Sequence, residues 1–471
     1  MKILIQGGRV INPATGFDAV CDVAIAAGRV VAIKNIPADF APSKTIDATG
    51  CVVAPGLVDL CARLREPGYE HEGMLESELG AAVAGGVTSL VCPPDTDPVL
   101  DEPGLVEMLK FRAEKLHQSR VFPLGALTRN LQGETLTEMA QLTEAGCIGF
   151  GQAEVPLANT QVLQRAMQYA ATFGYTVWLR PQELHLGKGV AASGALATRL
   201  GLAGVPVAAE TIALHTIFEL MRALGGHARN GSRPAAETRN GSRPAAEVRN
   251  SSQPAAQAGP RVHLCRISSA AGVALVRAAK ADGLRVTCDV SINSLHLTEG
   301  DIGYFDSRAR LCPPLRQQRD RDALRAALAD GTIDVLVSDH NPVEADAKNL
   351  PFAEAEPGAT GLELLLSLAL AWGEASGLDL LRTMARVTSA PAQVLGESLG
   401  TLQASLGQLV AGGVADVCVF DPAAQWSVSS STLKSQGKHT PFAHDMGGMP
   451  MQARVRCTIV SGHVAYEAAS A

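Results

Sequence analysis

Between residues 52 and 339 the sequence alternates apolar, strand-like segments with helical segments, and this alternation restricts the fold more than any other feature. The strand-like segments are VVAPGLVDL, VTSLVCPP, RVFPLGAL, CIGFG, YTVWLRP, RVHLCRIS, LRVTCDVSI and TIDVLVSD. The segments between them have helical periodicity, and glycine often follows the last turn, as in LTEMAQLTEAG. Eight strand–helix units predict an α/β fold of the (β/α)8 TIM-barrel type.

Both ends of the chain have a different pattern, made of short strands separated by turn residues. KILIQGGRVI and CDVAIAAGRVVAI lie near the N-terminus, and ADVCVFDP and ARVRCTIVSGHVAYE lie near the C-terminus. Two strand-rich ends around a barrel suggest one small β domain built from both termini. We therefore expect a composite, β-sandwich-like domain of residues 1–53 and 398–471, and a barrel of residues 54–397.

One internal segment does not fit the barrel pattern. RNGSRPAAET, RNGSRPAAEV and RNSSQPAAQA are three tandem decapeptides that fill residues 229–258. Because they contain no aromatic and almost no large aliphatic residue, they cannot bury a core, and we expect a disordered insert. The insert follows a helix and precedes a strand, which predicts a position on the barrel face opposite the active-site face.

Composition excludes several classes of function. A net charge of −7 argues against nucleic acid or an anionic membrane surface as the main partner. No segment approaches the ~20 continuous apolar residues that a membrane span needs. The ten cysteines are scattered without a CxxC pair, which is typical of a reducing compartment, and we expect a cytoplasmic protein.

The residues at the predicted strand ends are the part of the sequence that bears on chemistry, because catalytic residues of such barrels lie there. Potential metal ligands at these ends are Asp59, Cys61, Asp95, Asp339 and His340. The same ends carry the arginines Arg63, Arg180 and Arg266. Arginine has only N–H donors and stays protonated, so it cannot ligate a cation and repels one. Three arginines at one barrel mouth therefore argue against a metal site.

The chain resembles a known family at several motifs that follow one another in order. PGLVDLCARLREPG, CPPLRQQRDRDAL, IDVLVSDHNP, ADVCVFDP and KHTPF resemble the dihydroorotases of the amidohydrolase superfamily. The resemblance runs from about residue 2 to 467, apart from the insert. It implies that working members carry His-x-His at Cys61-Ala62-Arg63, a bridging lysine or aspartate near Gln152, and single histidines at Arg180 and Arg266. Only Asp339, with its neighbour His340, matches the metal-binding pattern.

The resemblance implies that two further positions recognise a substrate carboxylate, and one of them is altered. Arg65 matches the family's arginine, but Asp95 stands where the family has asparagine. Because Asp339 would be a costly unpaired carboxylate without a metal, we expect at least one of Arg63, Arg180 and Arg266 to lie within hydrogen-bond reach of it.

Within the family, the pattern looks like the non-catalytic dihydroorotase-like chains that accompany aspartate carbamoyltransferase in pyrimidine biosynthesis. This resemblance implies a hetero-oligomer in which the chain is a structural or regulatory partner, with no catalytic residue and no cofactor. Two alternatives remain open. One is an active cyclic amide hydrolase with an atypical zinc site around Cys61, Asp339, His340 and His296. The other is a binding module in which the arginines and Arg65 hold an anionic dicarboxylate.

Overall fold

The computed structural model describes residues 1–226, 259–443 and 449–469. The predicted disorder of the tandem repeats therefore falls outside the described residues. Within the described part of the chain, no helix combines the length and the apolar character that crossing a membrane requires.

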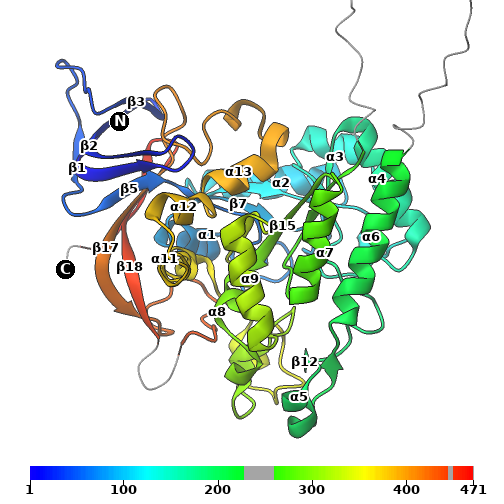
Figure 1. Ribbon diagram of the computed structural model, residues 1–471. Coiled ribbons are helices and arrows are strands. Elements are labelled where there is room, and N and C mark those ends of the chain that lie inside the picture. Colours follow the sequence, from blue (N-terminus) through cyan, green and yellow to red (C-terminus); the bar gives the residue numbers. More distant parts are fainter. Residues whose placement is uncertain (227–258, 444–448, 470–471) are drawn as a thin grey trace, which may run out of the picture.

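One sheet unites strands from both ends of the chain. Its order is β19-β18-β17-β5-β1-β2-β3, with β4 paired to β1. The strands are β1 (Lys2–Asn12), β2 (Phe17–Ala26), β3 (Arg29–Ile33), β4 (Lys44–Asp47), β5 (Val52–Pro55), β17 (Val417–Ser427), β18 (Pro450–Val460) and β19 (His463–Glu467). The antiparallel pair β5–β17 joins the two halves, and Figure 1 shows the N- and C-terminal ends beside this sheet. We propose that this sheet belongs to the composite domain.

The described residues between β5 and β17 contain the predicted barrel of parallel strands. These strands are β6 (Leu57–Asp59), β7 (Val87–Cys92), β8 (Arg120–Pro123), β9 (Gly125–Ala126), β10 (Phe150–Gly151), β11 (Thr176–Leu179), β14 (Arg261–Leu264), β15 (Val286–Ser291) and β16 (Val335–Val337). They pair in the orders β6-β7-β8 and β9-β10-β11-β14-β15-β16. Only Leu124 separates β8 from β9, so the two form one interrupted barrel strand. A parallel bridge between Ala62 and His340 connects the first strand to the last.

Helices between the strands cover the outside of the barrel, and α6, α7 and α9 stand side by side in Figure 1. The helices are α1 (Leu75–Ala84), α2 (Pro103–Lys115), α3 (Met139–Ala145), α4 (Thr160–Phe173), α5 (Ala195–Leu200), α6 (Ala208–Gly226), α7 (Ala270–Ala281), α8 (Ile292–His296), α9 (Gln318–Asp330), α10 (Ala345–Lys348), α11 (Leu365–Ala375), α12 (Leu380–Ala385) and α13 (Ser389–Leu395). Two short strands, β12 (Ala191–Ala192) and β13 (Gly204–Val205), pair with each other beside α5. Helix α4 shows the local signals well: Asn159 accepts from the first turn, and Gly174 ends the helix with φ of 75°.

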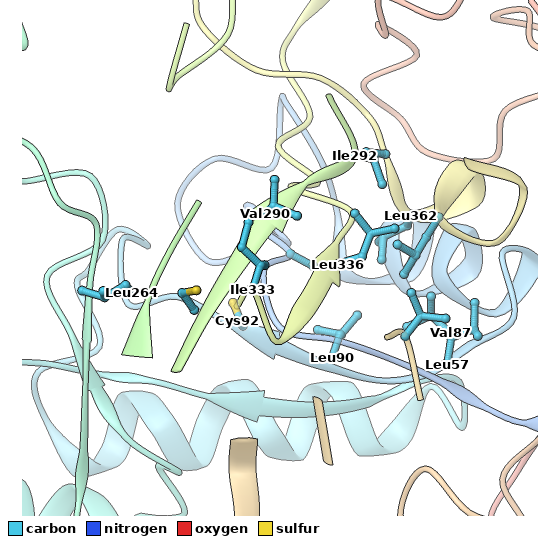
Figure 2. Close-up of a cluster of buried hydrophobic side chains, with 14 of the residues drawn as sticks. Leu57, Val87, Leu90, Cys92, Leu264, Val290, Ile292, Ile333, Leu336 and Leu362 are labelled. Atoms are coloured by element: carbon cyan, nitrogen blue, oxygen red, sulfur yellow. The ribbon is translucent and has the colours of Figure 1, made fainter. Parts of the chain in front are cut away.

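The barrel strands are buried on both faces, as parallel strands under helices must be. In β16, Leu336 points outward into the layer between strands and helices, whereas Val335 and Val337 point into the barrel. Figure 2 shows part of the outer layer, where Leu90 of β7 lies near Leu336. Because side chains fill the interior, the strand ends alone remain to build a site.

Candidate functional site

Side chains from five strand ends meet at the mouth of the barrel. Arg63 follows β6, Glu154 follows β10, Arg180 follows β11, Arg266 follows β14 and Asp339 follows β16. Together with Asp95, which follows β7, they form a network of ion pairs that we call the arginine–carboxylate cluster. The cluster contains three guanidinium groups and three carboxylates, so its formal charges balance.

Glu154 is the central acceptor of this cluster. Its Oε1 accepts from Nη2 of Arg63 at 2.9 Å and also from Nη2 of Arg266. Its Oε2 accepts from Nε of Arg180. The three arginine side chains are only 4 to 6% exposed, whereas the Glu154 side chain is 32% exposed. One carboxylate therefore closes the cluster from its solvent side.

The remaining two carboxylates each hold one arginine. Asp339 Oδ1 accepts from Nη1 of Arg266 at 3.0 Å, which confirms the prediction that an arginine lies within hydrogen-bond reach of Asp339. Asp95 Oδ2 accepts from Nε of Arg63 at 2.8 Å. Cys312, in the loop after η3 (Ser307–Ala309), completes the enclosure: its carbonyl accepts from Arg266, and its Sγ lies 3.0 Å from Nη2 of Arg180.

Burial and the charges of the arginines shift the pKa values of the carboxylates in the cluster. Burial alone would raise the pKa of Glu154, but the charges of Arg180, Arg266 and Arg63 outweigh burial and hold that pKa well below its usual range. Burial raises the pKa of Asp339, and the charges of Arg266 and Arg63 offset this only in part. Glu154 is thus the firmly ionised partner of the arginines.

The backbone at the mouth is strained where the cluster is built. Arg65, Ala153, Arg266 and Asp339 all have φ between 49° and 64°, a region that side-chain-bearing residues rarely adopt. Such strain persists only where surrounding interactions impose it, and it concentrates at functional sites. The mouth therefore combines sharply turned strand ends with arginine side chains.

Glu154 was missed by the sequence analysis, which placed the altered bridging position at Gln152. Gln152 is turned away from the cluster: its Nε2 donates to Oγ1 of Thr128 at 2.9 Å and to the carbonyl of Leu131 at 2.8 Å. A signal for Glu154 did exist in the sequence. Three arginines at one mouth need carboxylates, and Glu154 is an acidic residue close to the end of a barrel strand.

The residues of the predicted alternative metal site are not brought together. Cys61 lies against Asp339, with Sγ and Oδ1 3.9 Å apart, but His340 turns away and its Nε2 lies 2.8 Å from Oε2 of the buried Glu78. His296 bonds the carbonyl of Leu368 through its Nε2 at 2.9 Å. Of the four predicted members, Cys61 and Asp339 alone have side chains that face each other.

Arg65 and Asp95, predicted as an anion-binding pair, take separate partners. Nε of Arg65 lies 2.6 Å from Oε2 of Glu72 and donates to the carbonyl of Pro342, and its Nη2 lies 3.5 Å from Glu356. Asp95 belongs to the arginine–carboxylate cluster instead. In this arrangement Arg65 already faces two carboxylates, which compete with any bound anion.

The residues at the mouth do not fit a catalytic zinc ion. Both Glu154 oxygens and Oδ1 of Asp339 already accept from guanidinium groups. The buried atoms of the cluster that lack a hydrogen-bond partner are donors, Nη1 of Arg63 and Nε of Arg266, and a cation cannot bind to donors. Burial also raises the pKa of the Cys61 thiol well above its usual value, which disfavours the thiolate that zinc binds.

A second group of potential ligands lies beneath the cluster. Among the described residues, ligand atoms of His263, Cys265 and Asp289 lie within 4.8 Å of one another. Asp289 already accepts from the backbone N–H of Arg266 at 2.7 Å and lies 2.9 Å from Nε2 of His263. His263 and Asp289 are fully buried, so we interpret this group as a support that orients the turn at Arg266.

Comparisons with known proteins agree with one another. Residues 50–229 match the family model described as dihydro-orotase-like. The dihydroorotase-like protein of Pseudomonas aeruginosa is 42% identical over 468 residues, which is 99% of this chain and all of that protein. The dihydroorotase of a Geobacter species is 37% identical over 469 residues, again 99% of this chain and all of that protein.

Solved structures of low sequence identity share the fold. The L-hydantoinase of Arthrobacter aurescens matches with a TM-score of 0.80 at 22% identity, over 99% of this chain and 96% of that one. This likeness confirms the predicted barrel with a β domain.

Proposed function

This chain belongs to the dihydroorotase-like family, and we propose that it has lost hydrolase activity and acts as a structural or regulatory partner of another enzyme. The observation that supports the proposed loss of hydrolase activity is that Arg63, Arg180 and Arg266 all form ion pairs with Glu154. The name dihydroorotase-like protein of the Pseudomonas relative is compatible with such a loss.

The chemical argument concerns the activation of water. Hydrolysis of a cyclic amide needs a nucleophile, and metal hydrolases obtain one by lowering the pKa of a bound water. The guanidinium groups at this mouth supply positive charge, but none can accept a proton from water at neutral pH. The carboxylate best placed to accept one, Glu154, has its pKa held well below the usual range, which makes it a poor base. Neither the arginines nor Glu154 therefore suits the role of general base, which supports the proposed loss of hydrolase activity.

Metal analysis and an activity assay on the same sample test this part. We expect the purified protein to hold far less than one zinc per chain and to show no turnover of dihydroorotate, with an active dihydroorotase relative as the positive control. Asp339→Asn serves as the matched variant. Stoichiometric zinc together with turnover that this variant abolishes would show that the chain is an enzyme with an atypical site.

For the partner, we propose aspartate carbamoyltransferase, on the basis of the family resemblance. Ion pairs hold the strand ends at the barrel mouth together without a metal, which suits a chain whose role is assembly. We expect the transcarbamoylase catalytic chain from the same organism to co-purify with this chain in a complex larger than either one. An active dihydroorotase relative as bait provides the control. Separate elution of the two chains at micromolar concentrations would exclude aspartate carbamoyltransferase as the partner.

A specific observation also favours a second candidate, the binding of a small dicarboxylate at the mouth. Nη1 of Arg63 and Nε of Arg266 are buried donors without a partner, and a carboxylate could satisfy both. The balanced charge of the cluster weakens this candidate, because no net positive charge remains to attract the anion. Calorimetry with carbamoyl aspartate decides the matter, and absence of heat together with an unchanged melting temperature would exclude it.

A further inference from the structure

Three large apolar side chains lie exposed on two loops beside the barrel mouth, and we call them the aromatic patch. Tyr304 and Phe305, between η2 (Glu299–Ile302) and η3, are 93% and 38% exposed, and Leu350, after α10, is 46% exposed. The two loops follow β15 and β16, so both lie on the barrel face that carries the arginine–carboxylate cluster. Large apolar side chains that gather on a surface mark contact sites for other proteins.

Several contacts hold the two loops of the aromatic patch together. Nζ of Lys348, in α10, donates to the carbonyl of Ser307 at 3.2 Å and to that of Arg310 at 3.1 Å. In return, Oγ of Ser307 donates to the carbonyl of Lys348. Phe305 and Asn349 line the same cavity. The members of the patch therefore lie on neighbouring loops that are joined below the surface.

The backbone and the ring contact fix the two aromatic residues in their exposed position. Phe305 has a φ of 62°, which a bulky side chain rarely adopts, and such strain concentrates at functional sites. The rings of Tyr304 and Phe305 meet edge to face, with their centroids 5.5 Å apart. Aromatic side chains that are ordered before binding lose little conformational freedom on association, which suits them as interface anchors.

The exposed charges around the aromatic patch are negative. Arg308 pairs with Asp306, Lys348 is buried against two carbonyls, and Lys438 donates to the carbonyl of Leu433. Segments 299–307 and 344–356 contain no exposed lysine or arginine. Four exposed carboxylates in these segments have no ion-pair partner among the described residues and form an acidic rim: Asp301, Glu344, Asp346 and Glu354. A protein surface that complements this rim carries lysine or arginine.

We propose that the aromatic patch and the acidic rim are the surface on which this chain docks its protein partner. Tyr304 and Phe305 enter an apolar pocket of the partner, and basic residues around that pocket face the carboxylates of the rim. The inference rests on the proposed function, because it takes the transcarbamoylase catalytic chain as the partner. If no substrate has to enter the mouth, a partner can cover this face of the barrel.

Biolayer interferometry of the full chain against the transcarbamoylase catalytic chain from the same organism tests the aromatic anchors. The double variant Tyr304→Ala, Phe305→Ala should raise the Kd at least about tenfold, mainly through faster dissociation. Its melting temperature should match that of the wild-type, because both side chains are exposed. Phe111→Ala is the matched control: Phe111 is 58% exposed on α2, outside the patch, and its loss should leave the Kd within about twofold of the wild-type.

A second pair of variants tests the acidic rim. Glu344→Gln together with Asp346→Asn should slow association and make the Kd depend less on salt concentration. Glu107→Gln, which removes an exposed carboxylate of α2, should change neither quantity. Salt dependence that is equal in the rim variant and in the wild-type would overturn the role of the rim.

The same measurements separate this inference from the proposed function. A complex that keeps its wild-type Kd in the aromatic double variant would overturn the docking surface and leave the partner in place. Absence of any complex with the wild-type chain would remove the partner and the docking surface together. Self-association of this chain that the aromatic substitutions abolish would assign the patch to a second copy, and would also overturn the proposal.

Discussion

Replacing Glu154 with glutamine is the sharpest test of how the barrel mouth is held. The substitution keeps the size and one acceptor oxygen but removes the charge that faces Arg63, Arg180 and Arg266. Asp95 and Asp339 would then be left to balance three buried guanidinium groups, which leaves one positive charge uncompensated. We expect the variant to fold with a markedly less stable barrel.

The expected loss can be worked from the burial of the partners. Removing one member of a buried ion pair costs about 3 to 5 kcal/mol. The Glu154 side chain keeps 32% exposure, so water partly screens its charge and the lower value of about 3 kcal/mol applies. Unfolding entropy of about 2.1 cal/mol/K per residue gives roughly 1 kcal/mol/K for a chain of 471 residues. The melting temperature should therefore fall by about 3 °C.

Scanning calorimetry of the wild-type protein, Glu154→Gln and Glu107→Gln measures this difference. Glu107 is an exposed carboxylate on α2, so its variant reports the effect of removing a charge far from the mouth. A melting temperature of Glu154→Gln equal to that of the wild-type or of the control would refute the idea that Glu154 holds the three arginines.

The pH dependence has a defined sign. Because the folded-state pKa of Glu154 lies below its ordinary value of 4.5, its contribution to stability is fully present above pH 4.5 and is lost as pH falls through the folded-state pKa. The difference in melting temperature between the wild-type and Glu154→Gln should stay constant from pH 8 to pH 5 and become smaller on further acidification. A gap that widens in acid would contradict the assigned direction.

Three other groups give further predictions. Glu78 hydrogen-bonds His340 and the segment 434–438, so Glu78→Gln should loosen that segment. Limited trypsin digestion should then cut the segment several times faster than in the wild-type, and an unchanged cleavage rate would count against this role. Burial lowers the pKa of His296 to about 4, so the stability that it contributes above pH 6.5 is lost as pH falls from 6.5 through 4. In urea unfolding, the free energy of unfolding of His296→Gln should therefore fall less steeply than that of the wild-type over this pH range. Burial likewise lowers the pKa of Lys348 to about 7, so the stability advantage of the wild-type over Lys348→Met should shrink as pH is lowered from 10 to 6, and a growing advantage would refute it.

The barrel was predictable from the sequence because its signal is local. Each strand must be apolar on both faces, and each helix must end near a glycine or a polar turn, so the eight units can be recognised one by one. Val335-Leu336-Val337 is such a strand, and Gly174 marks such a helix end. The arginines at the strand ends were identified in the same way, from their position in the repeating pattern.

The partners of those arginines could not be derived by the same reasoning. Arg63 and Glu154 are 91 residues apart, and Arg266 and Glu154 are 112 residues apart. Their contacts depend on how far each loop carries its side chain past the strand end, which local propensity does not encode. The same limit applied to His340, which is adjacent to Asp339 in the chain but turns to Glu78 behind the mouth.

The sequence by itself determined the barrel and the presence of arginines at its strand ends, because both depend on residue type at positions that a periodic pattern defines. Only the tertiary structure decided that Glu154 receives the three arginines, that Gln152 does not take part, and that Arg65 faces Glu72 instead of Asp95. The physical reason is that ion pairing at the mouth depends on distances of a few ångströms between loops far apart in the chain.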